Sequence, residues 1–330
     1  MIPALVLTAG LATRLRPLSF VRAKAALPVA GDPLVRRILR WLAGHDVTDA
    51  VLNLHHLPDT ITHIIGNGDE DGVRVRYSWE TTILGSAGGP RHALPLLGSS
   101  PFLIVNGDTL TDVDVATLVA DHRRSGALVT LAVMPNTEPD KYSGLAVDAH
   151  GAVTGVVRRG GSQPSFHFVG VQVAQAEAFA SLPDNMPCES VKQRYPFLIA
   201  ERRGSVRAFV TSAEFFDIGT PQDYLATSLV LGNRESGLGI REAGSDASAR
   251  LYGARTHVDA GARVEDCVLW DDVQVEADVW LRRCIVTDGV RVPAGSSWEN
   301  ATIRVADGEL TPGERFVGGL AVGDLTRSRG

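Results

Sequence analysis

Residues 4–34 read ALVLTAGLATRLRPLSFVRAKAALPVAGDPL, and the fold class can be inferred from how this stretch begins. Its first five residues form an apolar run that predicts a buried strand of the parallel type. The run breaks into a small-residue turn at Ala9 and Gly10, where backbone N–H groups can approach phosphates closely. Arg14 and Lys24 then add positive charge. The stretch predicts a phosphate-binding turn, although spacing alone leaves open an ordinary surface turn with two basic residues.

Apolar strand-like runs alternate with helical patterns through the first part of the chain. The runs lie at 4–8, 50–54, 73–77, 102–105 and 128–133. Residues 34–42 carry apolar side chains at a helical spacing. The alternation predicts an α/β domain with a mostly parallel central sheet and flanking helices, in a Rossmann-like arrangement. Ligands of such sheets bind beyond the carboxyl ends of the strands, where Gly10, Asp108 and the 84–89 loop fall.

The opening stretch resembles the signature of sugar-1-phosphate nucleotidyltransferases, which runs roughly G-x-G-T-R-L-x-P-L-T and then P-K-x-x-L-P-V. The matching positions are Gly10, Thr13, Arg14, Leu15, Pro17, Leu18, Lys24, Leu27, Pro28 and Val29. Two positions depart from it, because Ala12 stands for the second glycine and Ala23 for the proline before the lysine. Ala12 puts a methyl group where the backbone should approach the phosphates, so it must keep φ negative or tolerate strain.

Five further segments resemble this family, in the family's order, across most of the first 230 residues. They are Asn53–His56, Leu84–Gly89, Phe102–Asp108, Phe166–Val173 and Phe216–Tyr224. Each match is weak alone, but their shared order makes chance agreement small. The resemblance implies a nucleotidyltransferase catalytic domain at the start of the chain.

Composition and charge restrict the class of partner. A chain of 330 residues with 44% hydrophobic residues can build one large or two ordinary domains. The net charge of −6 argues against general binding of nucleic acid or of an anionic membrane, so local basic residues must bind any phosphate. No apolar stretch is long enough for a transmembrane helix. The three cysteines indicate neither a disulfide framework nor a metal site, which predicts a reducing cytoplasm.

The last part of the chain repeats with a period of seventeen residues, because Val264–Ala277 aligns with Leu281–Ala294 and weaker copies lie on either side. Short strands at a constant period predict a β-solenoid in which each coil buries its apolar face against its neighbours. The repeat resembles the left-handed β-helix of hexapeptide-repeat proteins, and that resemblance alone gives the handedness. Cys267 and Cys284 align, and we predict that they are stacked, inward-facing fillers.

This organisation predicts three parts of the chain and an assembly surface. The parts are a catalytic domain over 1–232, a linker over 233–246, and a short left-handed β-helix with a C-terminal tail over 247–330. A short solenoid has open strand edges that must be capped. We expect Trp270, Trp280 and Trp298 to be exposed near the coils and the β-helix to form a homo-oligomer. The alternative is that the solenoid only packs back on the catalytic domain.

The resemblance implies an in-line displacement, in which a sugar 1-phosphate attacks the α-phosphorus of a nucleoside triphosphate and pyrophosphate leaves. The nucleophile is already anionic, so positioning and charge neutralisation can supply the catalysis. By resemblance, Arg14 and Lys24 neutralise the phosphates. Asp108 and Asp217 match the family's two metal-binding aspartates, and Mg²⁺ favours one or two carboxylates together with phosphate oxygens.

The resemblance also implies contacts to the nucleotide and to the sugar. The nucleotide-binding residues are Ala9, Gly10, Thr13, Glu80, Gly85 and Gly88, and the sugar-binding residues are Asn106, Arg159 and Gly170. A carboxylate at Glu80 would accept from the two donors on the guanine edge, which favours GTP. The Glu-Lys-Pro segment of many relatives is missing, because Arg158-Arg159-Gly160 stands in its place. Arg159 could replace the lysine charge, but nothing replaces the carboxylate.

We therefore predict a cytoplasmic, Mg²⁺-dependent enzyme that resembles mannose-1-phosphate guanylyltransferases and makes GDP-mannose or a related GDP-sugar. UTP- or dTTP-dependent transfer to N-acetylmuramate or glucose 1-phosphate stays open. A non-catalytic regulatory paralogue would be expected to lose Lys24, Asp108 or Asp217, and all three are present. An added acyltransferase on the solenoid would need a histidine in the coils, where only His257 occurs.

Overall fold

The computed structural model describes residues 2–98, 100–235, 251–308 and 310–326, and the chain divides into two compact units. Unit 1 contains Met1–Gly10 and Val35–Phe216, and unit 2 contains Leu11–Leu34 and Asp217–Gly330. The opening stretch is therefore divided between the two units: its strand, up to Gly10, belongs to unit 1, and its basic segment, from Leu11 onward, belongs to unit 2. The predicted linker lies outside the described residues from position 236 onward.

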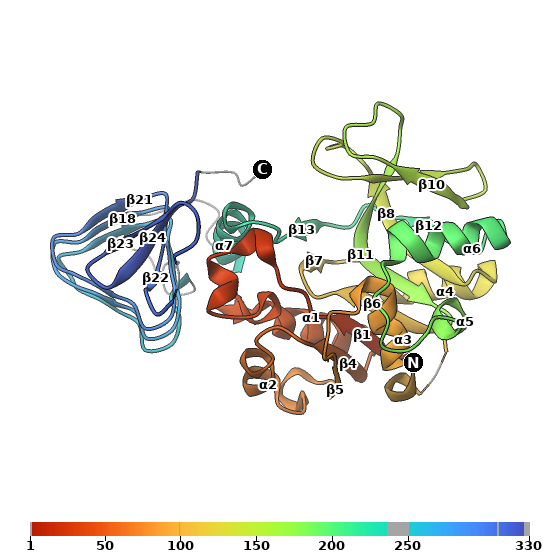
Figure 1. The fold of residues 1–330 in the computed structure, drawn as a ribbon, viewed down its shortest axis with the longest axis horizontal. Coiled ribbons are helices and arrows are strands. Elements are labelled where there is room, and N and C mark those ends of the chain that lie inside the picture. Colours follow the sequence, from red (N-terminus) through yellow and green to blue (C-terminus); the bar gives the residue numbers. More distant parts are fainter. Residues whose placement is uncertain (1, 99, 236–250, 309, 327–330) are drawn as a thin grey trace. The chain divides into compact units, whose positions relative to one another are not determined.

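Parallel strands form one half of the sheet in unit 1, as predicted. The order β6–β1–β4–β5 joins Phe102–Asn106, Ala4–Leu7, Asp49–Leu54 and Arg74–Trp79. All three pairs of neighbours are parallel. The strands β1, β4 and β6 are almost wholly buried, which is typical of a parallel sheet with both faces covered. Their carboxyl ends meet along one edge (Figure 1).

The other half of the sheet adds antiparallel pairs. Its strands are β8 (Val129–Pro135), β9 (Gly144–Val147), β10 (Val153–Val157), β11 (Phe166–Ala174) and β12 (Val206–Val210). β11 runs antiparallel to both β6 and β8, and β12 runs parallel to β8. The register of β11 shifts between Phe168 and Gln172, and Gly170 lies within this shift at a φ of 84°. The short strand β7 (Thr109–Thr111) pairs with β13 (Phe215–Asp217).

Helices cover the sheet of unit 1 (Figure 1). They are α1 (Leu34–Ala43), α2 (Asp59–Ile65), α3 (Gly85–Leu97), α4 (Val115–Ser125), α5 (Glu177–Ala180) and α6 (Tyr195–Glu201). α1 confirms the helix predicted over 34–42. Leu5, Phe102 and Phe179 lie in the fully buried core. Within the described ranges, no helix has the length and apolar character needed to cross a membrane.

Unit 2 begins with the basic segment of the opening stretch. Three short 3-10 turns lead into a hairpin of β2 (Pro28–Val29) and β3 (Asp32–Pro33). Ala30 and Gly31 join these strands with φ values of 49° and 81°, as a tight type I′ turn requires. α7 (Pro221–Glu235) packs on β2.

The solenoid of unit 2 has the predicted repeat. Its three parallel sheets are β14 (His257–Val258), β17 (Gln274–Val275) and β20 (Arg291–Val292); β15 (Arg263–Glu265), β18 (Trp280–Arg282) and β21 (Ser297–Glu299); and β16 (Val268–Leu269), β19 (Ile285–Val286) and β22 (Ala301–Val305). Val258 pairs with Val275, and Val275 pairs with Val292, in the period that the sequence predicts. Cys267 and Cys284 are buried in the solenoid core, which confirms them as stacked fillers.

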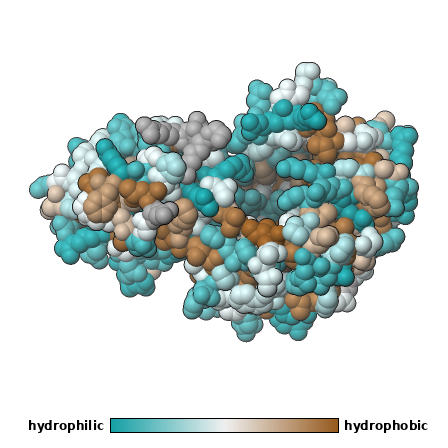
Figure 2. All heavy atoms as spheres, in the orientation of Figure 1, coloured by the Kyte–Doolittle hydropathy of each residue, from teal (hydrophilic) through white to brown (hydrophobic). Residues whose placement is uncertain are grey.

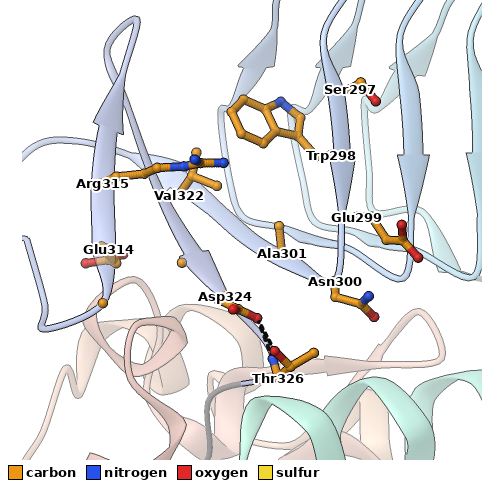
Figure 3. Close-up of a pocket in the computed structure, with 12 residues that line it drawn as sticks. Ser297, Trp298, Glu299, Asn300, Ala301, Glu314, Arg315, Val322, Asp324 and Thr326 are labelled. Atoms are coloured by element: carbon orange, nitrogen blue, oxygen red, sulfur yellow. Dashed lines mark hydrogen bonds between the residues drawn. The ribbon is translucent and has the colours of Figure 1, made fainter.

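The solenoid ends in a hairpin that the repeat did not predict. β23 (Glu314–Val317) and β24 (Leu320–Asp324) extend the sheet of β22 in antiparallel order. A cavity of about 650 Å³ lies between the last coil and this hairpin (Figure 3). Trp298 lines it, and the Arg315 guanidinium carbon lies 5.3 Å from the centroid of its ring.

The prediction that Trp270 is exposed was wrong. Trp270 is fully buried, and its indole Nε1–H donates to the Tyr224 hydroxyl of α7 at 2.9 Å. Trp280 and Trp298 are half-buried, and each lies against an arginine guanidinium. The sequence pattern could not reveal the burial of Trp270, because the residue that covers it is 46 positions away along the chain.

Candidate active site

Asn53 ties together the ends of three neighbouring strands in unit 1. It belongs to β4, is 3% exposed, and accepts from the Thr8 N–H at 2.6 Å through Oδ1. Its Nδ2 donates to the Glu80 Oε1 at 2.7 Å. Thr8 directly follows β1, and Glu80 directly follows β5. The amide of Asn53 therefore fixes the carboxyl edge of the sheet at the point where ligands of such folds bind.

Glu80 is buried, and both of its carboxylate oxygens bond within the protein. Besides the bond from Asn53, Oε2 accepts from the Leu84 N–H at 2.9 Å. A buried carboxylate is costly unless it is hydrogen-bonded, and here the bonds hold the loop that leads into α3. Each oxygen retains a second lone pair, so the contact to a base stays a prediction.

The first turn of α3 is covered by the protein's own chain. The N–H groups of Ala87 and Gly88 both donate to the Cys188 carbonyl, at 2.8 and 3.1 Å. A Cβ on Gly85 would lie 2.9 Å from that carbonyl oxygen, and one on Gly88 would lie 2.5 Å from the Met186 carbonyl oxygen. Packing within unit 1 therefore explains why glycine occupies both positions. The nucleotide contact predicted for the two glycines stays a prediction.

β6 brings two of the predicted residues to the same edge of the sheet. Asp108 is half-buried, and the Thr109 hydroxyl donates to its Oδ1 at 3.3 Å. A Cβ on Gly170 would lie 2.9 Å from the Thr109 Oγ1 and 3.2 Å from the Asn106 Cβ. The structure thus places Asn106 and Gly170 side by side, whereas Arg159 lies exposed in the turn after β10.

His167 on β11 is a polar residue of this region that the sequence analysis did not single out. Its ring centroid lies 4.1 Å from that of Tyr142 and 4.8 Å from that of Phe215. Neither ring nitrogen has a hydrogen-bond partner among the described residues. Burial, and to a lesser extent Lys141, lowers the pKa of His167 to about 4. The neutral imidazole can therefore donate one hydrogen bond and accept one at pH 7.

In unit 2, Ala12 adopts the conformation expected of the glycine that it replaces. Its φ and ψ are both 47°, in the left-handed region, so the alternative of tolerated strain is confirmed. The Ala12 carbonyl accepts from the Leu15 N–H at 2.9 Å and from the Ser19 hydroxyl at 3.0 Å, and these bonds hold the turn in place. At the second departure, Ala23 has a φ of −55°, which is a value that proline also adopts.

Three polar side chains converge on the space beside Gly219. A Cβ at this position would lie 3.1 Å from the Asp217 Oδ2, 3.3 Å from the Arg14 Nη1 and 3.3 Å from the Asp223 Oδ2. The structure thus brings together Arg14 and Asp217, which sequence analysis named separately. Asp223 was not predicted, and its Oδ2 also accepts from the Thr220 hydroxyl at 2.8 Å.

A glycine turn, strand-end carboxylates and a basic segment are features typical of α/β proteins that bind phosphate groups. A family model described as "Nucleotidyl transferase" matches residues 3–233, so the chain belongs to the nucleotidyl transferase family. A second model, described as "GlmU-like, C-terminal hexapeptide", matches residues 237–298.

Individual relatives resemble most of the chain. A mannose-1-phosphate guanylyltransferase of Mycobacterium tuberculosis is 26% identical over 86% of this chain and 83% of its own length. A mannose-1-phosphate guanyltransferase of Aspergillus fumigatus is 27% identical over 97% of this chain and 95% of its own length. The crystal structure of HddC from Yersinia pseudotuberculosis superimposes with a TM-score of 0.62 at 23% identity, covering 70% of this chain and all of its own, and shows the same fold.

The strain at Ala12 gives a first prediction. A left-handed conformation costs an L-residue about 1–2 kcal/mol, and glycine at this position would remove that cost. Glycine also adds conformational entropy to the unfolded chain, which lowers the free energy of unfolding by about 0.4–1 kcal/mol. We expect Ala12→Gly to raise the free energy of unfolding by about 0.5 kcal/mol and to raise turnover, because the backbone can then approach the phosphates. Urea unfolding and pyrophosphate release measure the two effects.

Ala30→Gly is the matched control for this prediction. Ala30 also has a positive φ, of 49°, but it lies in the β2–β3 turn. The substitution should relieve similar backbone strain without changing turnover. Equal gains in turnover from both variants, or a loss of stability in Ala12→Gly, would contradict the interpretation.

Proposed function

We propose that this chain joins GTP and mannose 1-phosphate to form GDP-mannose and pyrophosphate. The agreement of its relatives carries the proposal, because a bacterial and a fungal protein named for this activity align with 86% and 97% of the chain. Arg14, Lys24, Asp108 and Asp217, the residues expected to act on phosphates and metal, are all present. These four side chains support a catalytic member of the family over a regulatory one.

The proposed mechanism rests on position and charge. The phosphate of the sugar is already an anion at neutral pH, so its oxygen can attack the α-phosphorus without a side-chain base. Lys24 and Arg14 neutralise the charge on the phosphates while the bond to pyrophosphate breaks. A Cβ on Gly10 would meet no atom within 4 Å, which leaves room at the end of β1 for a phosphate group.

A divalent metal ion is general in this family, and we propose Mg²⁺ held by Asp108 and Asp217. Asp217 fits such an ion, because Gly219 leaves open a space that a side chain would close and the Asp217 Oδ2 borders that space; Asp108 is added by the family resemblance. Two carboxylates completed by phosphate oxygens are a donor set that Mg²⁺ favours. When bound, the ion supplies further neutralisation of the phosphate oxygens.

The proposed contacts to base and sugar divide between two regions of unit 1. Glu80 holds the loop that leads into α3 through the Leu84 N–H, and we place the nucleotide base beside this loop. Asn106 and Gly170 lie together at the end of β6, where we place the sugar. His167 lies three residues before Gly170 on β11, but both of its ring nitrogens are buried, so we assign it no contact to the sugar.

A substrate panel tests the proposal. We expect the highest kcat/KM, read by pyrophosphate release, for GTP with mannose 1-phosphate among five nucleoside triphosphates and the 1-phosphates of mannose, glucose and N-acetylmuramate. Lys24→Met should lower turnover by roughly 10²–10³, because it removes a charge from the phosphates. A preference for UTP or dTTP would replace the proposed substrate, and inactivity with every pair would favour the regulatory alternative.

The metal assignment gives a separate prediction. Asp108→Asn should lower turnover by roughly 10²–10³, about 3–4 kcal/mol of transition-state stabilisation, with a smaller effect on nucleotide binding. Asp114→Asn is the control, because Asp114 caps α4 through the Thr117 N–H and asparagine caps a helix equally well. Turnover of Asp108→Asn within threefold of wild type would exclude this role.

We also propose that two copies associate through the solenoid. β23 is the outer strand of its sheet, and it exposes 64% of Phe316 and 36% of Val317. Figure 2 shows apolar atoms gathered on the visible face where β23 and β24 lie in Figure 1. An apolar edge strand is a template for pairing with another chain, and a two-fold dimer is its simplest partner.

Light scattering on the full chain measures this association. We expect a dimer for the wild type and a monomer for Phe316→Lys, because a charged side chain on an edge opposes strand pairing. Val210→Lys is the control, since Val210 is 54% exposed at the end of β12 in unit 1. A monomeric wild type, or a Phe316→Lys dimer, would leave the alternative that the solenoid only packs on its own chain.

A further inference from the structure

Two aspartates of successive coils face the same arginine of the opening stretch. Asp271 and Asp288 occupy equivalent positions of the repeat, seventeen residues apart, and the Asp271 N–H donates to the Asp288 Oδ1 at 3.1 Å. Neighbouring strands lie about 4.8 Å apart, so two carboxylates stacked in this way repel each other. In the coils before and after, the equivalent positions are Ala254 and Val305.

Arg22 neutralises this pair of carboxylates. Its Nε donates to the Asp288 Oδ2 at 2.7 Å, and its Nη2 donates to the Asp288 Oδ1 and the Asp271 Oδ2, each at 2.6 Å. The Arg22 side chain is only 13% exposed. Burial raises the pKa of Asp288, and the bonds from Arg22 oppose that rise. A fork of parallel N–H donors suits this geometry, and lysine could not reproduce it.

A second set of contacts connects Arg22, which precedes Lys24, with Pro28, which follows it. The Arg22 guanidinium carbon lies 5.4 Å from the centroid of the Trp270 ring, and the Trp270 Nε1–H donates to the Tyr224 hydroxyl at 2.9 Å. The Tyr224 hydroxyl in turn donates to the Pro28 carbonyl at 2.5 Å. Trp270 and Tyr224 are fully buried, so these bonds form away from water.

Lys24 therefore lies between two anchored points of the chain. Arg22 precedes it by two residues, and Pro28 follows it by four. The residues between them form a 3-10 turn, Lys24–Ala26, in which the Ala26 N–H donates to the Ala23 carbonyl at 2.8 Å. Two residues span at most about 7 Å, so a displacement of Arg22 must move Lys24.

We infer that Arg22 is a positioning residue for Lys24, and that Asp271, Asp288 and Trp270 of the solenoid hold it in place. The inference rests on the proposed function, because it takes Lys24 to act on the transferred phosphate. It gives the coils around Trp270 and Asp288 a part in turnover beyond assembly. Misplacement of a catalytic group by about 1 Å can cost on the order of 10²-fold in rate.

The test uses the full chain with Asp288→Asn, which keeps the shape of the side chain but removes its charge. We expect kcat to fall roughly 10- to 100-fold at a temperature where circular dichroism shows the variant folded, with the KM for GTP changed less than threefold. Asp272→Asn is the matched control. Asp272 pairs with Arg255 on the exposed surface of the preceding coil, next to Asp271, and its φ of 59° suits asparagine, so kcat should stay within twofold of wild type.

A double variant separates positioning from a general effect on the fold. If Arg22 acts through Lys24, Asp288→Asn should lower the kcat of Lys24→Met by less than threefold, because the group that it positions is already gone. An undiminished loss in the double variant, or wild-type kcat in folded Asp288→Asn, would overturn the inference and leave the proposed function standing. Wild-type turnover in Lys24→Met would overturn the assignment of Lys24 itself, and with it the basis of the inference.

Discussion

The site depends on one constraint, which is that neighbouring parallel strands end along a single edge of the sheet. β1, β4, β5 and β6 obey it, and the side chain of Asn53 fixes three of these ends by bonding to Thr8 and Glu80. Everything placed at that edge, from the loop before α3 to Asp108 after β6, depends on this register. Since these bonds are buried, loss of one partner would leave another polar group unpaired, which is costly.

Much of this fold could be predicted from the sequence, because its strongest signals are local. The buried strands β1, β4 and β6 appear as apolar runs, and the solenoid appears as a seventeen-residue period that the pairing of Val275 with Val292 reproduces. The prediction that was wrong, the exposure of Trp270, concerns a residue whose surroundings come from a distant part of the chain. Trp270 was expected at the surface because tryptophans of a short solenoid resemble a contact patch, but Tyr224 of α7 covers it.

The same distinction applies to the candidate site. The sequence predicts Gly85 and Gly88 near a nucleotide, and that contact stays a prediction. The structure adds that the backbone of residues 186–188, about a hundred positions later, leaves room only for glycine at both positions. No local pattern could indicate that segment. By contrast, the proximity of Arg14 to Asp217 at Gly219 joins two motifs that resemblance had named one by one. Motifs name residues, but only the folded chain shows which of them meet.

The ion pairs around Arg22 also indicate that unit 2 is less stable than it could be, in return for one defined orientation of the chain. Removing charges from water costs free energy that an ion pair rarely returns in full, so apolar residues at Arg22 and Asp288 could stabilise the coils as well. An apolar pair would not fix direction, however, whereas the fork of Arg22 and the two oxygens of Asp288 allow one orientation of the chain. The pair occurs where the solenoid meets the segment that carries Lys24, and the coil surface elsewhere has exposed pairs such as Arg255 with Asp272. A need for orientation at Lys24 explains this distribution, and a need for stability alone does not.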